Sequence, residues 1–251
     1  MGRIVAVVNQ KGGVGKTTSA VNITAALVAE GKKVLLCDFD PQANATSGMG
    51  VEKRKVKNSV YDVIVNEVPA SQAIVSTKFG DVLPSSADLA GAAVELLTLP
   101  EPNFRLKNAL AEIKDRYDFI FIDCPPSLEM LTLNGLAAAD SILVPVQCEY
   151  YALEGLSDLM STLRAVKKRM NPNLEIFGVL LTMFDGRTNF CTQVAQEVRR
   201  HFPGKVYATV IPRNIRLAEA PSHGLPVNAY DKHSRGAQAY KAVAEEIIRK
   251  N

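Results

Sequence analysis

The chain has 251 residues, of which 47% are hydrophobic and 22% are charged, a composition typical of a globular protein that buries a full core. Its formal net charge is +3, and no apolar run approaches the ~20 residues that a membrane-spanning helix needs. Because the chain enters a strand-like apolar pattern at Ile4 without the features of a secretory signal, we expect a cytoplasmic protein.

Apolar runs alternate with helical patterns along the chain. The expected core strands are residues 4–8, 34–37, 119–122, 142–146, 176–181 and 206–211. The expected helices are residues 17–29, 105–114, 128–138, 152–170, 192–201 and 236–250. This alternation predicts an α/β fold with a mostly parallel, twisted β-sheet flanked by helices on both faces. No repeat, low-complexity stretch or linker divides the sequence, so we expect one domain over residues 1–251.

A glycine-rich loop joins the first expected strand to the first expected helix. It reads Gln10-Lys11-Gly12-Gly13-Val14-Gly15-Lys16-Thr17-Thr18. Glycines let backbone N–H groups turn toward phosphate oxygens, and the helix N-terminus adds the positive end of its dipole. We therefore expect Lys16 to hold the β- and γ-phosphates and Thr17 to ligate Mg²⁺. The usual phosphate loop has glycine where this chain has Gln10, and it offers no role for the additional lysine, Lys11.

Acidic residues follow two of the expected strands. Asp123 ends the apolar run 119–122, which is the position of a Walker B acid beside Mg²⁺, often bound through a water. Asp38 and Asp40 follow the second strand, and side chains two residues apart in an extended segment share a face. We expect both of these carboxylates to approach the γ-phosphate, one near the metal and one near the attacking water.

The four cysteines suggest no metal or redox chemistry. They are widely separated and lack the CxxC spacing of zinc and dithiol sites. Three of them adjoin apolar runs, so we expect buried, inert side chains. They are Cys37, Cys124, Cys148 and Cys191.

The positive charge is concentrated near the C-terminus. Residues 1–179 carry 18 Lys and Arg against 20 Asp and Glu, whereas residues 180–251 carry 11 against 6. Such asymmetry indicates an anionic partner, either nucleic acid or a membrane surface, although a solvated basic face is an alternative.

Four segments extend this pattern well beyond the phosphate loop. They are DFDPQANAT (38–46), DCPPS (123–127), PVQCEYYALEG (145–155) and IPRNIRLAEAPSHG (211–224). With the loop, these motifs resemble the deviant Walker A ATPases and, among them, the chromosomal ParA proteins, also called Soj. The resemblance covers essentially the whole chain. It implies a P-loop NTPase fold of the SIMIBI type, with ATP and Mg²⁺ as cofactors and ATP hydrolysis as the reaction.

The same resemblance assigns roles to individual residues. Lys11 would reach phosphates bound by the other subunit of a homodimer, so that ATP is sandwiched between two protomers. Asp40 would position the water, and Asp38, Asp123 and Thr17 would support the metal. The catalytic residues would be Lys11, Lys16 and Asp40, and segment 123–127 would sense the γ-phosphate.

The resemblance also implies an adenine pocket near residues 182–183 and 212–214. The residues expected to contact ATP are Lys11, Gly12, Gly13, Val14, Gly15, Lys16, Thr17, Thr18, Met183, Pro212 and Asn214.

Family members bind double-stranded DNA without sequence preference, and the matching arginines here are Arg187 and Arg216. Contacts of this kind are electrostatic, so affinity should fall steeply with salt. The alternative is that these arginines only pair with nearby acids such as Asp185 and Glu219. The expected protein partner is a ParB (Spo0J) protein that stimulates hydrolysis, and the ATP-bound dimer would be associated with the nucleoid.

Two other functions remain open as alternatives, and a third, sequence-specific repression, is not expected. A membrane-associated regulator similar to MinD shares the ATP sandwich, but this sequence ends within its last expected helix without an amphipathic anchor. An electron-transfer ATPase similar to the nitrogenase iron protein, or a cluster carrier of the Mrp type, needs surface cysteines, which we do not expect here. Sequence-specific repression needs the N-terminal helix-turn-helix domain of plasmid-type relatives, which this sequence lacks because its first strand begins at about Arg3.

Overall fold

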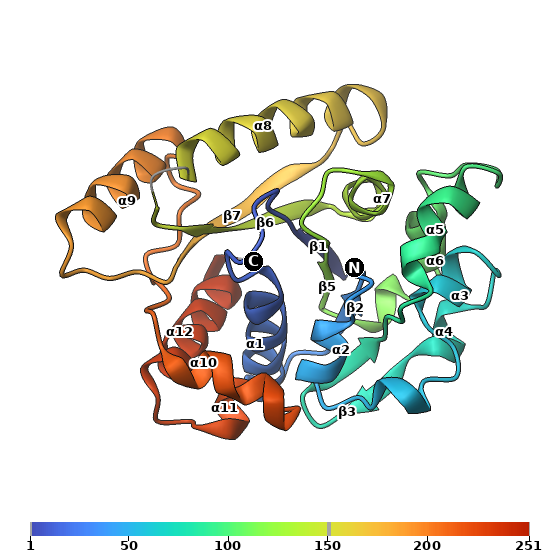
Figure 1. Ribbon diagram of the computed structural model, residues 1–251, viewed down its shortest axis with the longest axis horizontal. Coiled ribbons are helices and arrows are strands. Elements are labelled where there is room, and N and C mark those ends of the chain that lie inside the picture. Colours follow the sequence, from blue (N-terminus) through green and yellow to red (C-terminus); the bar gives the residue numbers. More distant parts are fainter. Residues whose placement is uncertain (1, 150–151, 251) are drawn as a thin grey trace.

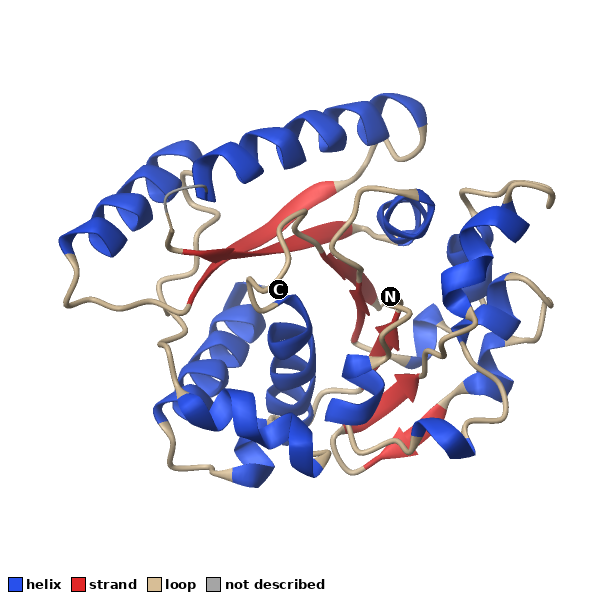
Figure 2. Cartoon of the chain, viewed as in Figure 1, coloured by secondary structure: helices blue, strands red, loops and turns tan. Residues whose placement is uncertain are grey.

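The strands form one mostly parallel sheet in the computed structural model, which describes residues 2–149 and 152–250. The seven strands lie in the order β3-β4-β2-β5-β1-β6-β7, and only the β3–β4 pair among them is antiparallel. Their bounds are β1 (Arg3–Val7), β2 (Val34–Asp38), β3 (Val75–Thr77), β4 (Gly80–Leu83), β5 (Phe119–Asp123), β6 (Ser141–Gln147) and β7 (Glu175–Thr182). The expected α/β fold is therefore confirmed (Figure 2). Residues 150 and 151, part of the motif 145–155, lie outside the described residues.

Helices cover both faces of the sheet (Figure 1). The helices are α1 (Lys16–Ala29), α2 (Asn44–Gly48), α3 (Val60–Ile64), α4 (Ala70–Ala73), α5 (Leu89–Leu96), α6 (Arg105–Ala111), α7 (Met130–Ala138), α8 (Ala152–Arg169), α9 (Asn189–His201), α10 (Ile215–Glu219), α11 (Val227–Tyr230) and α12 (Arg235–Lys250). Three short 3₁₀ turns accompany them: η1 (Lys53–Lys55), η2 (Lys114–Arg116) and η3 (Ala220–His223). The longest expected helices are confirmed, with ends that differ by a few residues.

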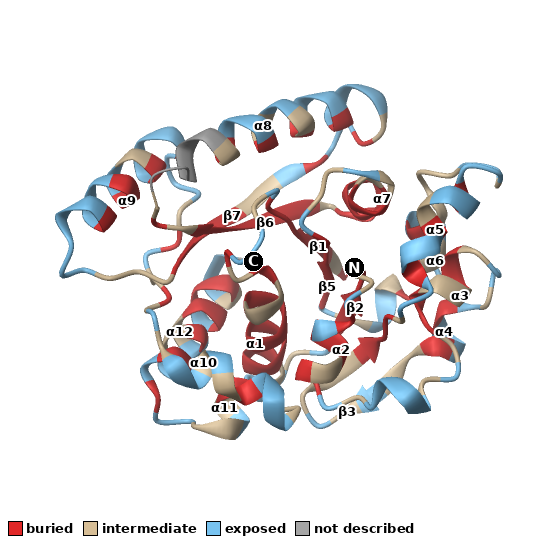
Figure 3. Cartoon of the chain, viewed as in Figure 1, coloured by how far each residue is buried: buried red, intermediate tan, exposed pale blue. Residues whose placement is uncertain are grey.

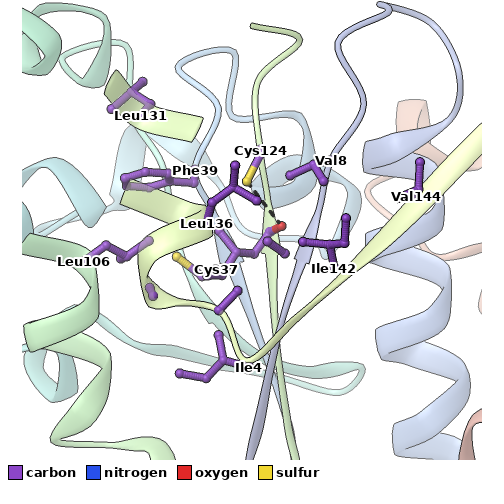
Figure 4. Packing of buried hydrophobic residues seen from close by; sticks show 14 of the residues in the cluster. Ile4, Val8, Cys37, Phe39, Leu106, Cys124, Leu131, Leu136, Ile142 and Val144 are labelled. Carbon is purple, nitrogen blue, oxygen red and sulfur yellow. Dashed lines mark hydrogen bonds between the residues drawn. The ribbon is translucent and has the colours of Figure 1, made fainter. Parts of the chain in front are cut away.

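Alternate side chains of each central strand enter two separate apolar cores. Ile4 and Ala6 of β1 point into the core beneath α5 to α9, whereas Val5 and Val7 point into the core beneath α1 and α12. Figure 3 shows that the central strands are buried along most of their length, and Figure 4 shows part of the first core. A strand covered on both faces is apolar at every position, which is why the sequence shows these strands as unbroken apolar runs.

All four cysteines are free and buried, as expected. In Figure 4, Cys37 and Cys124 pack among aliphatic side chains of the first core. Burial raises the pKa of the Cys124 thiol above its usual range, so the thiol stays protonated and unreactive near neutral pH.

The strand expected at residues 206–211 is absent. This segment runs beside β7, where the N–H groups of Tyr207 and Ile211 donate to the carbonyls of Val179 (3.0 Å) and Leu181 (2.8 Å). Between these two bonds the N–H groups of Ala208 and Thr209 turn instead to the Glu246 carboxylate, at 3.1 and 2.8 Å. A carboxylate from α12 therefore interrupts the ladder that the apolar run predicted.

The sequence did not reveal the β3–β4 hairpin at one edge of the sheet. These strands have only three and four residues, and Thr77 joins them by donating to the Gly80 carbonyl at 2.7 Å. Runs this short carry too little periodicity to be recognised from sequence. They nevertheless extend the sheet beyond β2 and leave β3 as an end strand.

Gly178 of β7 provides a test of this packing. A Cβ atom there would lie 2.3 Å from Cε2 of Tyr207, which is buried in the second core. Gly178→Ala should lower the free energy of unfolding by about 1–3 kcal/mol through overpacking, measured by urea denaturation. Gly155→Ala in α8 is the control, because a Cβ there meets nothing within 4 Å, and equal stability of the two variants would contradict this packing.

Candidate nucleotide-binding site

The phosphate loop lies between the end of β1 and the start of α1, as expected. Gly13 and Gly15 have φ angles of 76° and 86°, a left-handed conformation that favours glycine. A Cβ atom at Gly12 or Gly13 would meet nothing within 4 Å, so this part of the loop borders open space. The loop thus has the curled backbone and free approach that a phosphate group requires.

Asn9 anchors the loop to the sheet, a role that the sequence did not indicate. Its side-chain amide donates to the Pro145 carbonyl of β6 (2.7 Å), and its Oδ1 accepts the Lys11 N–H (3.0 Å). Since Asn9 is buried, these bonds fix where the loop leaves β1.

Lys16 is nearly buried at the first turn of α1. Its ammonium group donates to the Lys11 carbonyl at 3.1 Å, across the inside of the loop. Burial lowers the pKa of Lys16, and the nearby charge of Asp123 opposes this change. A buried cation with a single protein acceptor is well suited to exchange that acceptor for phosphate oxygens.

Asp38 and Asp123 lie opposite each other at the carboxyl ends of β2 and β5. The two residues are paired in the strand register, and both are fully buried. Asp38 accepts from the Thr46 N–H (2.6 Å), the Thr46 hydroxyl (2.7 Å) and the Asp40 N–H (3.3 Å). Asp123 has no comparable set of donors among the described residues, and only the nearby Thr17 hydroxyl favours its charged form as a hydrogen bond would.

Burial shifts both carboxyl groups toward their protonated forms. It raises the pKa of Asp38 to about 6, and the hydrogen bonds from Thr46 limit the rise. It also raises the pKa of Asp123, and the neighbouring Asp38 charge adds to this rise while Thr17 and Lys16 oppose it. Two buried carboxylates, of which Asp123 lacks hydrogen bonds to both oxygens, are unfavourable without a cation, and Mg²⁺ prefers oxygen ligands. The residues expected to hold Mg²⁺, Thr17, Asp38 and Asp123, therefore fit the ion.

Thr46 and Ser85 support this acidic pair from outside the expected motif residues. The Ser85 N–H donates to the Thr46 hydroxyl at 3.0 Å, and that hydroxyl donates to Asp38. Thr46 falls inside the segment 38–46 noted in the sequence, but only the fold shows that it returns to Asp38. A short polar residue eight positions after an acid carries no such signal by itself.

Lys11 forms an ion pair within its own chain. Its ammonium group lies 2.7 Å from Oε2 of Glu149, and the two side chains are 38% and 46% exposed. The Gln147 side-chain amide donates to the same carboxylate. A pair this exposed contributes about 0–1 kcal/mol, so Lys11 is held at the mouth of the site by a contact that is easily broken.

Asp40 lies half-buried just beyond Asp38. Its Oδ1 accepts the Gln42 N–H at 2.9 Å, and it contributes to the negative charge around Lys16. Because β1 and β2 run parallel, Asp40 after β2 and the loop after β1 lie at the same edge of the sheet.

A small pocket of about 200 Å³ adjoins the loop on its α10 side. Met183, Pro212 and Asn214 line it together with Gly15 and Thr18, so the fold brings the expected adenine residues next to the expected phosphate residues. Thr182 fixes this arrangement, because its hydroxyl donates to the Val14 carbonyl at 2.8 Å. The pocket is mainly apolar, as a surface that stacks on a base should be.

The two arginines expected to bind DNA lie outside the nucleotide site. Arg187, in the loop between β7 and α9, donates to both carboxylate oxygens of Asp185 at 2.8 and 2.7 Å. These bonds lower the pKa of Asp185 to about 2. Arg216 of α10 pairs with Glu219 (2.8 Å) and Asp231 (3.3 Å). The acid pairing considered as an alternative is therefore present in the isolated chain.

A glycine loop between strand and helix, with a buried lysine and two buried strand-end carboxylates, defines a P-loop nucleotide-binding protein. The family model described as "AAA domain" matches residues 2–176. Sporulation initiation inhibitor protein Soj of Bacillus subtilis is 55% identical over 249 residues, covering 98% of each chain. Chromosome partitioning protein ParA of Myxococcus xanthus is 47% identical, covering 100% of this chain and 89% of its own. The chain belongs to the ParA/Soj family of P-loop ATPases.

Solved structures agree with this assignment. A structure titled cobyrinic acid a,c-diamide synthase from Mycobacterium smegmatis, with bound ADP and magnesium, is 40% identical with a TM-score of 0.86 and covers 99% of this chain and 95% of its own. The cell division ATPase MinD of Pyrococcus furiosus is 31% identical with a TM-score of 0.82, covering 100% of both chains. The relatives with the higher sequence identities favour ParA/Soj over MinD. Among the described residues no helix is long and apolar enough to cross a membrane.

Asp123 provides a direct test of the acidic pair. Asp123→Asn removes a buried charge without changing side-chain volume much, so it should stabilise the nucleotide-free protein by about 1–3 kcal/mol at pH 8 while abolishing Mg²⁺-dependent ATP hydrolysis. Thermal unfolding and phosphate release measure the two effects.

The pH dependence gives the control for this prediction. A carboxyl whose pKa is raised on folding destabilises the protein as pH rises, so the stability advantage of the variant should shrink as pH is lowered and Asp123 of the wild type becomes protonated. A less stable variant, or a difference independent of pH, would contradict the account of Asp123.

Proposed function

We propose that this protein is an ATP-dependent DNA-partitioning ATPase that acts as a single domain. The observation that carries the proposal is the buried pair Asp38 and Asp123 facing a phosphate loop with two lysines. The relatives named Soj and ParA supply the biological context. The alternative of an iron–sulfur cluster carrier has less support, because it needs surface cysteines and all four cysteines are buried.

Mg²⁺, when bound with ATP, would neutralise charge on the β- and γ-phosphates. Thr17, Asp38 and Asp123 would hold it, the acids partly through water. Lys16 exchanges its bond with the Lys11 carbonyl for phosphate oxygens, and the loop N–H groups donate to the same anion. Asp40, which is half-buried beside the buried pair, orients the attacking water. Met183, Pro212 and Asn214 hold the adenine ring beside Gly15.

Lys11 links nucleotide state to oligomeric state in this proposal. It leaves Glu149, reaches phosphates bound by a second copy, and adds positive charge where negative charge develops as the terminal bond breaks. Because the pair with Glu149 is half exposed, giving it up requires little free energy. ATP would therefore be held between two protomers.

The dimer would bind double-stranded DNA through Arg187 and Arg216 and so associate with the nucleoid. Both guanidinium groups are exposed, and surface ion pairs such as those with Asp185 and Glu219 exchange readily for phosphate contacts. A ParB-type protein would stimulate hydrolysis, return the protein to monomers and release it from DNA.

Lys11→Ala should abolish ATP-driven dimerisation while leaving ATP binding, because Lys16 still holds the phosphates. Sedimentation with Mg²⁺ and ATP measures the first effect, and equilibrium dialysis measures the second. Lys241→Ala on α12 is the matched control. Normal dimerisation of the Lys11 variant would exclude an ATP sandwich.

Asp40→Ala should retain ATP and accumulate the dimer, while turnover falls by about 10²–10⁴ because no group orients the water. Phosphate release and sedimentation on one preparation measure both properties. Turnover close to wild type would show that another residue positions the water.

The Arg187→Ala, Arg216→Ala double variant should bind duplex DNA at least about tenfold more weakly than the wild type. The slope of log K against the logarithm of the salt concentration should be smaller in magnitude by about two, because two phosphate contacts are lost. ATP-driven dimerisation should persist. Arg116→Ala in η2 is the control, since Arg116 is exposed on a turn that precedes β5. The proposed DNA surface is wrong if the double variant binds DNA as the control does.

A membrane role similar to that of MinD predicts a different outcome. Co-sedimentation with anionic vesicles in the presence of ATP separates the two functions. Strong vesicle binding without DNA binding would replace the partitioning proposal.

A further inference from the structure

A wide groove lies at the β3 edge of the sheet, apart from the residues of the nucleotide site. Its walls are the end of α2 with the segment that follows it through η1, the β3–β4 hairpin, and η3 with the turn after it, and its volume is about 1080 Å³. In Figure 1, β3 and α2 both lie in the lower part of the molecule, and residues of both line this groove. The groove is lined by three separate parts of the chain, residues 47–56, 75–79 and 221–225.

The floor of the groove is apolar. Met49 is buried there, and Val51, Val56, Phe79 and Leu225 are half buried. Half-buried side chains of this kind gain from losing their remaining contact with water. The groove therefore favours an occupant that brings apolar side chains of its own.

The rim of the groove is basic. Lys53, Lys55, Lys78 and His223 line it, against one acid, Glu52. Glu52 pairs with Lys55 at 2.9 Å, and Lys53 donates to the Gln42 carbonyl at 2.6 Å.

Lys78 has no ion-pair partner in the described part of the chain. Arg54 and Lys57 add two further exposed cations beside the rim. This basic edge lies within residues 1–179, whose overall charge balance is negative, so the positive charge here is local. Its field favours an acidic occupant.

Backbone geometry adds an independent reason to expect an extended peptide. β3 is the end strand of the sheet and pairs with β4 on one side only. Val75, Ser76 and Thr77 of β3 all line the groove. An end strand presents backbone N–H and C=O groups that can pair with a further strand.

We propose that this groove binds an extended acidic segment of a partner protein, which adds to the sheet as a strand beside β3. Alternate side chains of the added strand would meet the apolar floor, and acidic side chains between them would meet Lys53 and Lys78. Duplex DNA fits less well, because its phosphates gain nothing from the apolar floor of a concave site. The proposal is independent of the nucleotide site and of Arg187 and Arg216.

The probe is a fluorescein-labelled dodecapeptide of alternating Asp and Val, titrated with the full-length protein and followed by fluorescence anisotropy. A Lys and Val repeat tests the sign of charge, and an Asp and Pro repeat tests strand addition, because proline has no N–H to donate. Labelled duplex and single-stranded DNA are titrated in parallel. Hydrogen exchange of residues 75–77 reports whether β3 gains a backbone partner.

The Lys53→Glu, Lys78→Glu double variant reverses the charge of the rim. Both side chains are exposed, so the fold should persist, which thermal unfolding and ATP binding check. Lys167→Glu on α8 is the matched control, since it changes an exposed lysine outside the groove.

The expected result is saturable binding of the Asp and Val peptide to the wild type. Binding should be at least about tenfold weaker when the protein is the double variant or when the peptide is the Asp and Pro repeat. Hydrogen exchange of residues 75–77 should slow when the Asp and Val peptide binds. Lys167→Glu should bind as wild type does. The proposal is overturned if wild type shows no saturable binding, if the double variant matches Lys167→Glu, or if exchange in β3 is unchanged. It is equally overturned if the double variant loses DNA binding instead, since the groove would then be a nucleic-acid site.

Discussion

The pairing of β2 with β5 places Asp38 directly opposite Asp123, and the functional part of the molecule depends on this contact. Both carboxylates are removed from water, which raises the pKa of each, and the charge of Asp38 raises the pKa of Asp123 further. In an isolated chain such a pair is destabilising. In the proposed function the same pair would become favourable when Mg²⁺ binds with ATP, because the cation would neutralise the two buried charges. Nucleotide binding should consequently stabilise the whole sheet, because the two strands that carry the acids lie at its centre.

Side chains from distant parts of the sequence hold this arrangement in place. Thr46 reaches back from α2 to Asp38, and Asn9 ties the phosphate loop to β6. Glu149, beyond the end of β6, holds Lys11 at the mouth of the site. The hydrogen bonds of Asn9 and Thr46 are buried, so breaking them would be costly. The ion pair between Lys11 and Glu149 is exposed and weak, which suits a residue that must change partners.

The sequence predicted the central strands, the phosphate loop and the acids because each has a local signature. Apolar runs such as 119–122 are continuous since both of their faces are covered, and the glycines of the loop mark a backbone that other residues rarely adopt. Contacts between distant positions have no such signature. Asn9 and Pro145 are 136 residues apart, and the Glu246 carboxylate that interrupts the expected strand 206–211 comes from the last helix. The β3–β4 hairpin was missed because it is short, and with it the basic groove.

Calorimetric titration of the nucleotide-free protein with ATP, in the presence of Mg²⁺ and then of a chelator, tests the central role of the acidic pair most directly. The account predicts at least about tenfold tighter binding with Mg²⁺, because the ion neutralises Asp38 and Asp123 as the phosphates enter. Equal affinity for ATP with and without Mg²⁺ would contradict it.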